Sequence, residues 1–174
     1  MSTFTNRMIR AAKLDVDLYE EVEADKTAMG QAMTVVVLSS LAAGIGTIGV
    51  FNIFGIIMHI IIALVGWFVW AYITYFIGTR LLPEPQTSAD HGELLRTIGF
   101  SSSPGILKVL GIIPMLVHLV NFIVSIWMLS AMIIAVRQAL DYRSTLRAVG
   151  VCAIGWIVQL MLYVLLWQVS GIFT

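Results

Sequence analysis

Three ionisable side chains in or beside long apolar stretches are the first candidates for chemistry in this chain. His59 and His118 lie deep within such stretches, and Lys108 lies at the edge of one. A pair of histidines in a membrane can relay protons or hold a metal ion. Two imidazoles without a nearby carboxylate or thiolate make a poor metal site. The alternative is that each histidine hydrogen-bonds to a neighbouring helix or to interfacial water, and we therefore expect no metal and no cofactor.

A glycine pattern at residues 44–49, with the sequence GIGTIG, matches the dinucleotide-binding motif GxGxxG. That motif needs a strand before it, a helix after it and an acidic residue about 20 positions further on. Here the pattern lies inside an apolar stretch, and no acidic residue stands at that distance. Small residues four positions apart let two helices approach closely. The pairs Ser40 with Gly44 and Ala42 with Gly46 therefore predict helix packing rather than nucleotide binding.

The distribution of charge places the chain in a membrane. Residues 27–79, 109–136 and 148–174 contain no Asp, Glu, Lys or Arg. A helix that crosses a hydrocarbon core of ~30 Å needs about 20 mostly apolar residues. Charged residues make up 11% of the chain, against roughly 25% in soluble domains. The net charge is zero, so nothing indicates long-range attraction to nucleic acid.

These stretches predict an all-α membrane bundle with five transmembrane helices, at about residues 27–51, 53–78, 105–120, 122–139 and 148–167. The third span is the shortest, and it contains the helix-breaking Pro114. Residues 1–26 form a cytoplasmic arm, whose Leu14, Leu18 and Val22 recur at helical spacing and predict an amphipathic helix. A second short helix, beginning near Asp90, is predicted to lie in the membrane interface.

The loops that connect five spans carry every charged residue on one side of the membrane. All ten basic residues and all ten acidic residues fall in the arm, in the loop between the second and third spans with its edge, and in the loop between the fourth and fifth spans. The positive-inside rule then places the N-terminus in the cytoplasm and the C-terminus outside. Any partner recognised through charge must therefore be cytoplasmic.

The acidic arm is the leading candidate for an interaction site, with three interpretations. Its carboxylates form a solvated face, or they meet arginines of the loops and fold the arm back over the bundle, or they bind a basic partner. In the last turn of the fourth span, Arg137 and Asp141 are spaced for a local ion pair. The candidate interaction residues are Tyr19, Glu20, Glu21, Glu23, Asp25, Arg96, Arg137, Asp141 and Arg143.

Several segments together resemble the Yip1 domain family, specifically its short bacterial members. They are DLYEEVEAD at 17–25, LRTIGF at 95–100, PG at 104–105, IIP at 112–114, WM at 127–128 and AVRQALDY at 135–142. The resemblance extends from about residue 14 to the end of the chain. It implies five spans and a cytoplasmic N-terminus, and it favours a bacterial cytoplasmic membrane. Eukaryotic relatives work in vesicle traffic and some bind Rab-type GTPases, but this arm lacks their long Pro- and Gly-rich region.

No enzymatic motif is present, so we expect a non-enzymatic protein. No serine has histidine and acidic partners on its own side of the membrane, and there is no phosphate-binding loop. The leading hypothesis is an organising protein or accessory subunit that contacts lipid and a membrane or cytoplasmic protein. The alternative is a small transporter or channel subunit with a path between helices or between protomers. A homo-oligomer is compatible with both.

Overall fold

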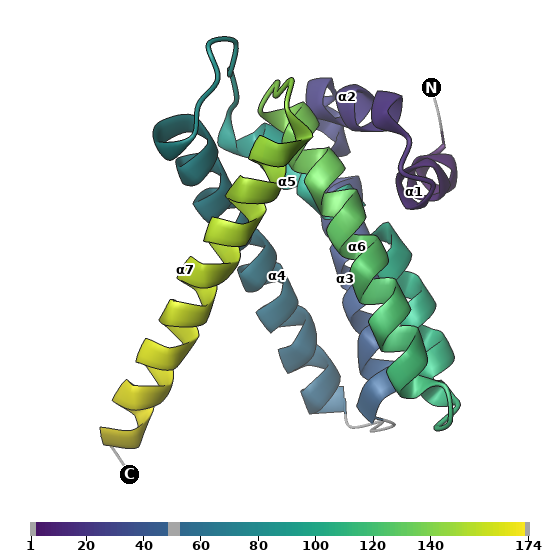
Figure 1. Cartoon of the computed structure of the whole chain (residues 1–174). Helices are drawn as coiled ribbons and strands as arrows, with labels where there is room; N and C mark the ends of the chain where they lie inside the picture. The colour runs from purple at the N-terminus through teal and green to yellow at the C-terminus, as the bar shows by residue number, and fades with distance from the viewer. Residues whose placement is uncertain (1–2, 49–52, 173–174) are drawn as a thin grey trace.

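The computed structural model describes residues 3–48 and 53–172, with side chains described for 3–46 and 54–161. Every regular element in these ranges is helical, which confirms the all-α prediction. In chain order the elements are α1 (Phe4–Ala12), α2 (Val16–Ala24), η1 (Lys26–Ala28), α3 (Met29–Ile48), α4 (Ile53–Phe76), η2 (Ile77–Leu81), α5 (His91–Ser101), η3 (Ser103–Ile112), α6 (Val117–Ala139) and α7 (Thr145–Ile172). Figure 1 shows the long helices running between two ends, with α1, α2 and α5 gathered at one of them.

Three helical segments are long and apolar enough to cross a membrane: Lys26–Gly46, Phe54–Leu81 and Val117–Ala139. They correspond to the predicted first, second and fourth spans, although the fourth begins at Val117 rather than near residue 122. The part of α7 whose side chains are described, Thr145–Met161, counts only as a shorter apolar helix. The count of five spans is therefore still a prediction.

The predicted third span, 105–120, does not form one helix. Residues Ser103–Ile112 wind as the 3₁₀ helix η3, and the chain turns before α6 begins at Val117. Pro114 lies in that turn. Because proline has no N–H and clashes with the preceding turn, it ends the helix that the sequence pattern had suggested. η3 connects α5 to α6, and its ten residues are shorter than the predicted 16-residue span.

The arm consists of two helices rather than the one amphipathic helix predicted. Leu14 lies in the turn between α1 and α2 with a φ of 62°, outside both helices. Thr3 accepts a hydrogen bond from the N–H of Asn6 at the start of α1, and Asp15 accepts one from the N–H of Asp17 at the start of α2. These N-caps satisfy amide groups that have no partner within the helix. α2 lies at one end of the bundle, and α1 lies beside the bundle near that end (Figure 1).

Small residues let η3 and α5 pack closely on α3. A Cβ on Gly46 would lie 1.9 Å from the carbonyl oxygen of Lys108, and a Cβ on Gly105 would lie 1.9 Å from the Oγ of Ser39. A Cβ on Gly99 of α5 would lie 2.7 Å from the Cβ of Ala32. Ala32, Ser39 and Gly46 are seven residues apart, so they share one face of α3.

The predicted small-residue pairs divide between two neighbours. Gly46 meets η3, whereas Gly44 faces α4, where the Cδ2 of His59 would be 3.8 Å from an added Cβ. Ala42 and Ser40 are both buried, and the Ser40 hydroxyl donates to the carbonyl of Val37 at 2.9 Å. The close packing predicted for Gly46 is therefore made with the 3₁₀ helix.

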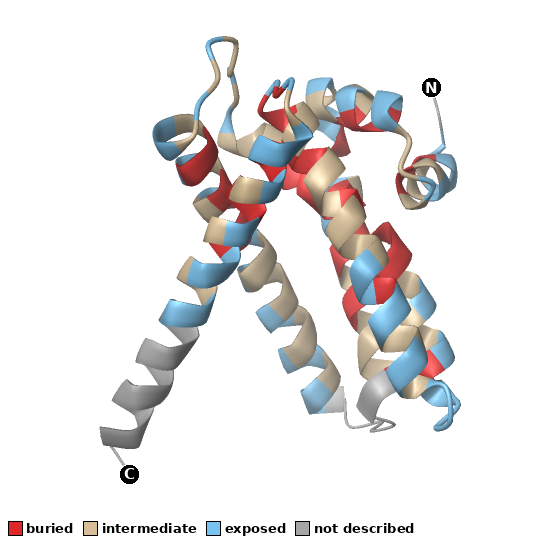
Figure 2. Ribbon diagram, in the orientation of Figure 1, coloured by how far each residue is buried: buried red, intermediate tan, exposed pale blue. Residues whose placement is uncertain are grey.

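Large apolar side chains are exposed along the long helices, particularly on α4. Phe54, Ile62 and Val65 have exposed fractions of 68%, 62% and 57%. Figure 2 shows the buried residues concentrated toward the end of the bundle that carries α5, while the described far part of α4 has intermediate and exposed residues and no buried one. An apolar surface of this extent is stable when hydrocarbon covers it, which agrees with a membrane location.

Replacing Gly46 with alanine tests the contact between α3 and η3. The added methyl meets the backbone of η3, so Gly46→Ala is expected to destabilise the protein by about 1–3 kcal/mol, as overpacking does. Gly66→Ala on α4 is the control, because an added Cβ there meets nothing within 4 Å. Thermal unfolding in detergent measures both variants. Equal midpoints for the two would show that α3 and η3 do not approach so closely.

Candidate functional site

Charged side chains gather at one end of the bundle, in a layer that we call the polar cap. The polar cap consists of α1, α2, α5 and the loop 140–144 between α6 and α7. Its centre is α5, which begins with a capping box formed by Asp90 and Glu93 and is buried from Leu94 to Ser101. The short helix predicted near Asp90 therefore forms, and it is enclosed by neighbouring helices. α5 carries the arm on one side and packs on α3, α4 and α6 on the others.

Arg96 of α5 attaches the arm to the bundle. This arginine is 4% exposed, and its Nε donates to the carbonyl of Val22 at 2.9 Å while Nη2 donates to the carbonyl of Glu23. Both carbonyls belong to the last turn of α2, where helix carbonyls lack intrahelical partners and the helix dipole is negative. The buried guanidinium thus finds acceptors for its N–H groups, and the terminal carbonyls of α2 find hydrogen-bond donors.

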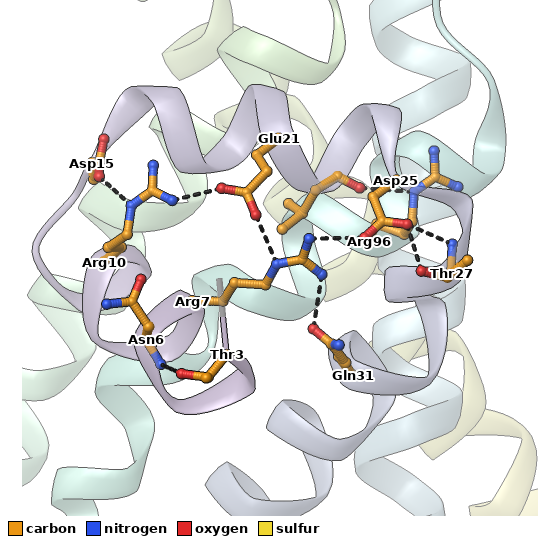
Figure 3. A network of polar contacts seen from close by, with 11 residues as sticks. Thr3, Asn6, Arg7, Arg10, Asp15, Glu21, Asp25, Thr27, Gln31 and Arg96 are labelled. Atoms are coloured by element: carbon orange, nitrogen blue, oxygen red, sulfur yellow. Dashed lines mark hydrogen bonds and ion pairs between the residues drawn. The ribbon is translucent and has the colours of Figure 1, made fainter. Parts of the chain in front are cut away.

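Arginines of the arm itself bind its carboxylates, as Figure 3 shows. Arg7 is 6% exposed and pairs with Glu21 at 2.9 Å and Asp25 at 2.8 Å. Its Nη1 also donates to the side-chain oxygen of Gln31 on α3 at 3.0 Å. The fold-back interpretation placed Glu21 and Asp25 against loop arginines, whereas in the structure these two acids bind Arg7. The arm does lie on the bundle, but these ion pairs within it are not the ones proposed.

A second arginine joins the two arm helices. Arg10 of α1 pairs with Asp15 at 2.6 Å and with the second oxygen of Glu21, also at 2.6 Å. The hydrogen bond from Arg10 lowers the pKa of Asp15. The pKa of Asp25 is lowered as well, chiefly by its hydrogen bond with Thr27 and then by that with Arg7. These acids are thus stabilised in their charged form.

Three further hydrogen bonds hold the arm in place. The indole N–H of Trp127 on α6 donates to the carbonyl of Ala12 at 2.7 Å. The amide of Gln138 donates to the carboxylate of Glu20 at 2.9 Å. Tyr19 is fully buried, and its hydroxyl donates to the carbonyl of Ala11 at 3.3 Å. The buried Tyr19 is therefore part of the arm's core and not a contact surface.

A pocket of about 490 Å³ lies where α2, α5, the end of α6 and the loop 140–144 meet. Charges of both signs line it. Burial raises the pKa of Glu23 to about 7, and the neighbouring carboxylates Asp141, Glu93 and Glu20 add to this, while Arg96 opposes it. The lining residues are Glu20, Glu23, Ala24, Glu93, Arg137, Gln138, Asp141, Tyr142 and Arg143.

The charged residues around this pocket form no ion pair with one another in the described part of the chain. The predicted pair of Arg137 with Asp141 is therefore absent. Instead, the Nε of Arg137 donates to the carbonyl of Tyr142 at 3.2 Å. Asp141 lies in the turn after α6 with a φ of 53°, which takes its side chain away from regular helical spacing. The backbone N–H of Arg143 donates to Glu84 at 3.0 Å.

The intramembrane polar residues lie outside this pocket. His59 faces Gly44 on α3, His118 is exposed in the first turn of α6, and Lys108 is half-buried on η3. No group of three or more His, Cys, Asp or Glu side chains able to hold a metal ion occurs among the described residues. The structure does not bring the two histidines into one site with a carboxylate.

Sequence reasoning missed the surroundings of His91. His91 is the first residue of α5, and its ring makes edge contacts with Phe68, Tyr72 and Tyr75 at centroid distances of 5.0, 5.7 and 6.3 Å. The removal of its ring from water lowers the pKa of His91. The helical spacing of the three aromatic residues on α4 was the available signal, because it marks one face on which a ring can pack.

Comparison with known proteins identifies one family. A family model described as the Yip1 domain matches residues 17–167, which is most of the chain. No curated protein and no solved structure matches it. The match covers α2, α5 and the whole region from α3 into α7, so it includes every wall of the pocket.

Replacing Arg96 tests the attachment of the arm. Arg96→Gln removes charged donors from the carbonyls of Val22 and Glu23, and hydrogen bonds to charged groups contribute about 1.5–3 kcal/mol. Amide hydrogen exchange in α2 is therefore expected to accelerate at least tenfold. Arg80→Gln, which changes an exposed arginine in η2, should leave that exchange unchanged. Unaltered protection of α2 in Arg96→Gln would contradict this role.

The raised pKa of Glu23 makes a pH-dependent prediction. In the unfolded chain the pKa of this carboxyl is 4.5, whereas in the folded protein it is about 7. The folded state binds more protons between these values, so ionisation of Glu23 lowers stability as the pH rises from about 4.5 to 7. Glu23→Gln should therefore raise the unfolding midpoint at pH 8 more than at pH 5. A gain that is the same at both pH values would show that Glu23 is not desolvated.

Proposed function

This chain belongs to the Yip1 domain family, and from that premise we propose that it is a non-enzymatic membrane protein that organises other proteins or lipids at the membrane surface. The polar cap is the part proposed to act. It gathers charged groups on a rigid support, while the long helices present apolar surface. The single observation that carries the proposal is that Arg7, Arg10 and Arg96 hold the arm in place, while other charged groups of the polar cap, such as Glu20 and Arg143, form no ion pair with any described residue.

The proposal includes five crossings, made by α3, α4, η3, α6 and α7. η3 packs on α3 and α6, and at ~2 Å per residue in a 3₁₀ helix its ten residues reach ~20 Å. The 28 residues of α7 reach ~42 Å, which is more than the hydrocarbon core requires. In Figure 1, α1 lies near one end of the bundle and α7 ends at the other. An odd number of crossings agrees with that placement.

The proposed orientation has the polar cap in the cytoplasm. Arg7, Arg10 and Arg96 lie in the polar cap, and Arg80 and Arg147 flank its loops. Short loops rich in basic residues stay on the cytoplasmic side of a membrane. The likeness to short bacterial members of the family supports the cytoplasmic membrane of a bacterium as the location.

A partner is proposed to bind at the exposed rim of the pocket. Glu20 on α2 and Arg143 in the loop are both exposed and form no ion pair within the described ranges. Such rim charges steer and select a partner through complementary charge. A partner surface with basic groups opposite α2 would suit this arrangement.

Reversing one charge on α2 tests the proposal. Glu20→Lys should reduce recovery of a co-purifying partner several-fold, because the reversed charge repels a basic surface. Asp17→Lys is the matched control, since it makes the same change on an exposed residue of the same helix away from the pocket. Quantitative mass spectrometry of the tagged full chain in mild detergent measures both.

The outcome that would contradict this function is specific. If no protein depends on Glu20, and vesicles of the purified chain conduct ions, the protein is a channel or transporter instead. That alternative requires a polar path between helices or protomers, along which His59, Lys108 or His118 would have to lie.

A further inference from the structure

We propose that the pocket of the polar cap binds a phosphoethanolamine group, with carboxylates receiving its ammonium and Arg137 receiving its phosphate. This inference goes beyond the proposed organising role and needs no protein partner. It rests on the volume of the pocket, on the signs of the charges around it and on its place at the membrane surface.

The pocket offers acceptors for a primary ammonium on two helices and a loop. Glu20 and Glu23 come from α2, Glu93 from α5 and Asp141 from the loop. One oxygen of Glu20 accepts from Gln138, and one of Glu93 accepts from the backbone of Asp90, so each keeps a second oxygen. An alkylammonium group has three N–H donors, which can be shared among several of these carboxylates.

Arg137 offers the complementary site for an anion. Its Nε is held by the carbonyl of Tyr142 at 3.2 Å, which fixes the plane of the guanidinium. Four carboxylates line the same pocket, yet Arg137 forms no ion pair with any of them in the described chain. A planar guanidinium binds phosphate oxygens through paired N–H donors. The exposed Arg143 at the rim adds a second positive charge.

The presence of both signs favours a zwitterion over a simple cation. A divalent metal needs several oxygen ligands close together. No cluster of three or more acidic, histidine or cysteine side chains that could hold a metal ion occurs among the described residues. A polyamine would meet the carboxylates but would leave the guanidinium of Arg137 without an anionic partner. A zwitterion satisfies both sets and leaves the net charge of the pocket unchanged. The volume of about 490 Å³ lies in the range of small-molecule sites.

The position of the pocket gives it access to lipid headgroups as a source of this ligand. Arg137 is in the last turn of the membrane-crossing α6, which is where a lipid phosphate is found. Free phosphoethanolamine presents the same ammonium and a phosphate, although its phosphomonoester carries more negative charge than the phosphodiester of the lipid, and it can reach the pocket from water. A choline headgroup differs in one respect that matters here, because its quaternary ammonium has no N–H to donate to the carboxylates.

Thermal unfolding of the purified full chain in detergent tests the proposal with defined lipids. Added dioleoyl-phosphatidylethanolamine should raise the unfolding midpoint by a few degrees more than the same amount of dioleoyl-phosphatidylcholine, since a ligand of the folded state stabilises it. Arg137→Gln and Glu23→Gln should each abolish the difference between the two lipids. Arg80→Gln, outside the pocket, should retain it.

The other measurements distinguish the lipid from the free compound as the source of the ligand, and they can overturn the inference. Stabilisation by millimolar phosphoethanolamine without an effect of the lipid supports the site and assigns it to the free compound. Equal effects of the two lipids with none from phosphoethanolamine would overturn the proposal. So would a preference for phosphatidylethanolamine that persists in both pocket variants, or stabilisation by a lysine-rich peptide alone. Glu23→Gln keeps the test decisive if Arg137→Gln fails to fold.

Discussion

The bond between Arg96 and the last turn of α2 determines how the charged end of the protein is arranged. A guanidinium that is 4% exposed needs hydrogen-bond acceptors, and the terminal carbonyls of a helix need donors. Arg96 reaches the carbonyls of Val22 and Glu23 because α5 is enclosed by the long helices. This contact places α2 across the bundle, with Glu20 near Gln138 on α6. The pocket lies between α2, α5 and the end of α6, and the side chain of Arg96 sets the distance between α2 and α5.

A second constraint acts in the bundle itself. Ala32, Ser39 and Gly46 form a face of α3 on which α5 and η3 rest with little space for a Cβ on their glycines. In a membrane, helices gain no hydrophobic energy by leaving lipid, so close packing of small residues contributes much of their association. The same face of α3 therefore supports both the 3₁₀ helix and α5, and through α5 it supports the polar cap.

Local patterns predicted much of this architecture. The absence of charge in residues 27–79 predicted two long helices, because hydropathy depends only on composition over about 20 residues. Pro114 was recognised, but its effect depends on what the freed chain packs against, and the sequence shows nothing of the groove that η3 occupies on α3. The predicted helix at 105–120 failed for that reason. Buried α5 was likewise predicted to be an interfacial helix, because its charged residue Arg96 is satisfied by a carbonyl of α2 that a sequence does not reveal.

The polar contacts were the least predictable part. The sequence identified the carboxylates of the arm as candidates. It did not indicate Arg7 and Arg10 as their partners, because these arginines lie before the turn at Leu14. That turn, with its positive φ, folds α1 back against α2 and brings Arg7 to Glu21 and Asp25. Arg137 and Asp141 have the spacing of an ion pair, yet the helix ends between them. Long-range geometry, rather than spacing along the chain, decides which charges pair.

A chemical cross-link between two cysteines tests most directly whether the arm lies on the bundle in the membrane. Glu20→Cys and Gln138→Cys, combined in a Cys152→Ser background, replace two side chains joined by a 2.9 Å hydrogen bond. A short bis-maleimide applied to intact membranes should join the two cysteines rapidly and almost completely, because it spans the gap left by the two shortened side chains. The pair Asp17→Cys with Gln138→Cys should cross-link far less. Slow and equal cross-linking of both pairs would contradict the account, because the arm would then move freely away from α6.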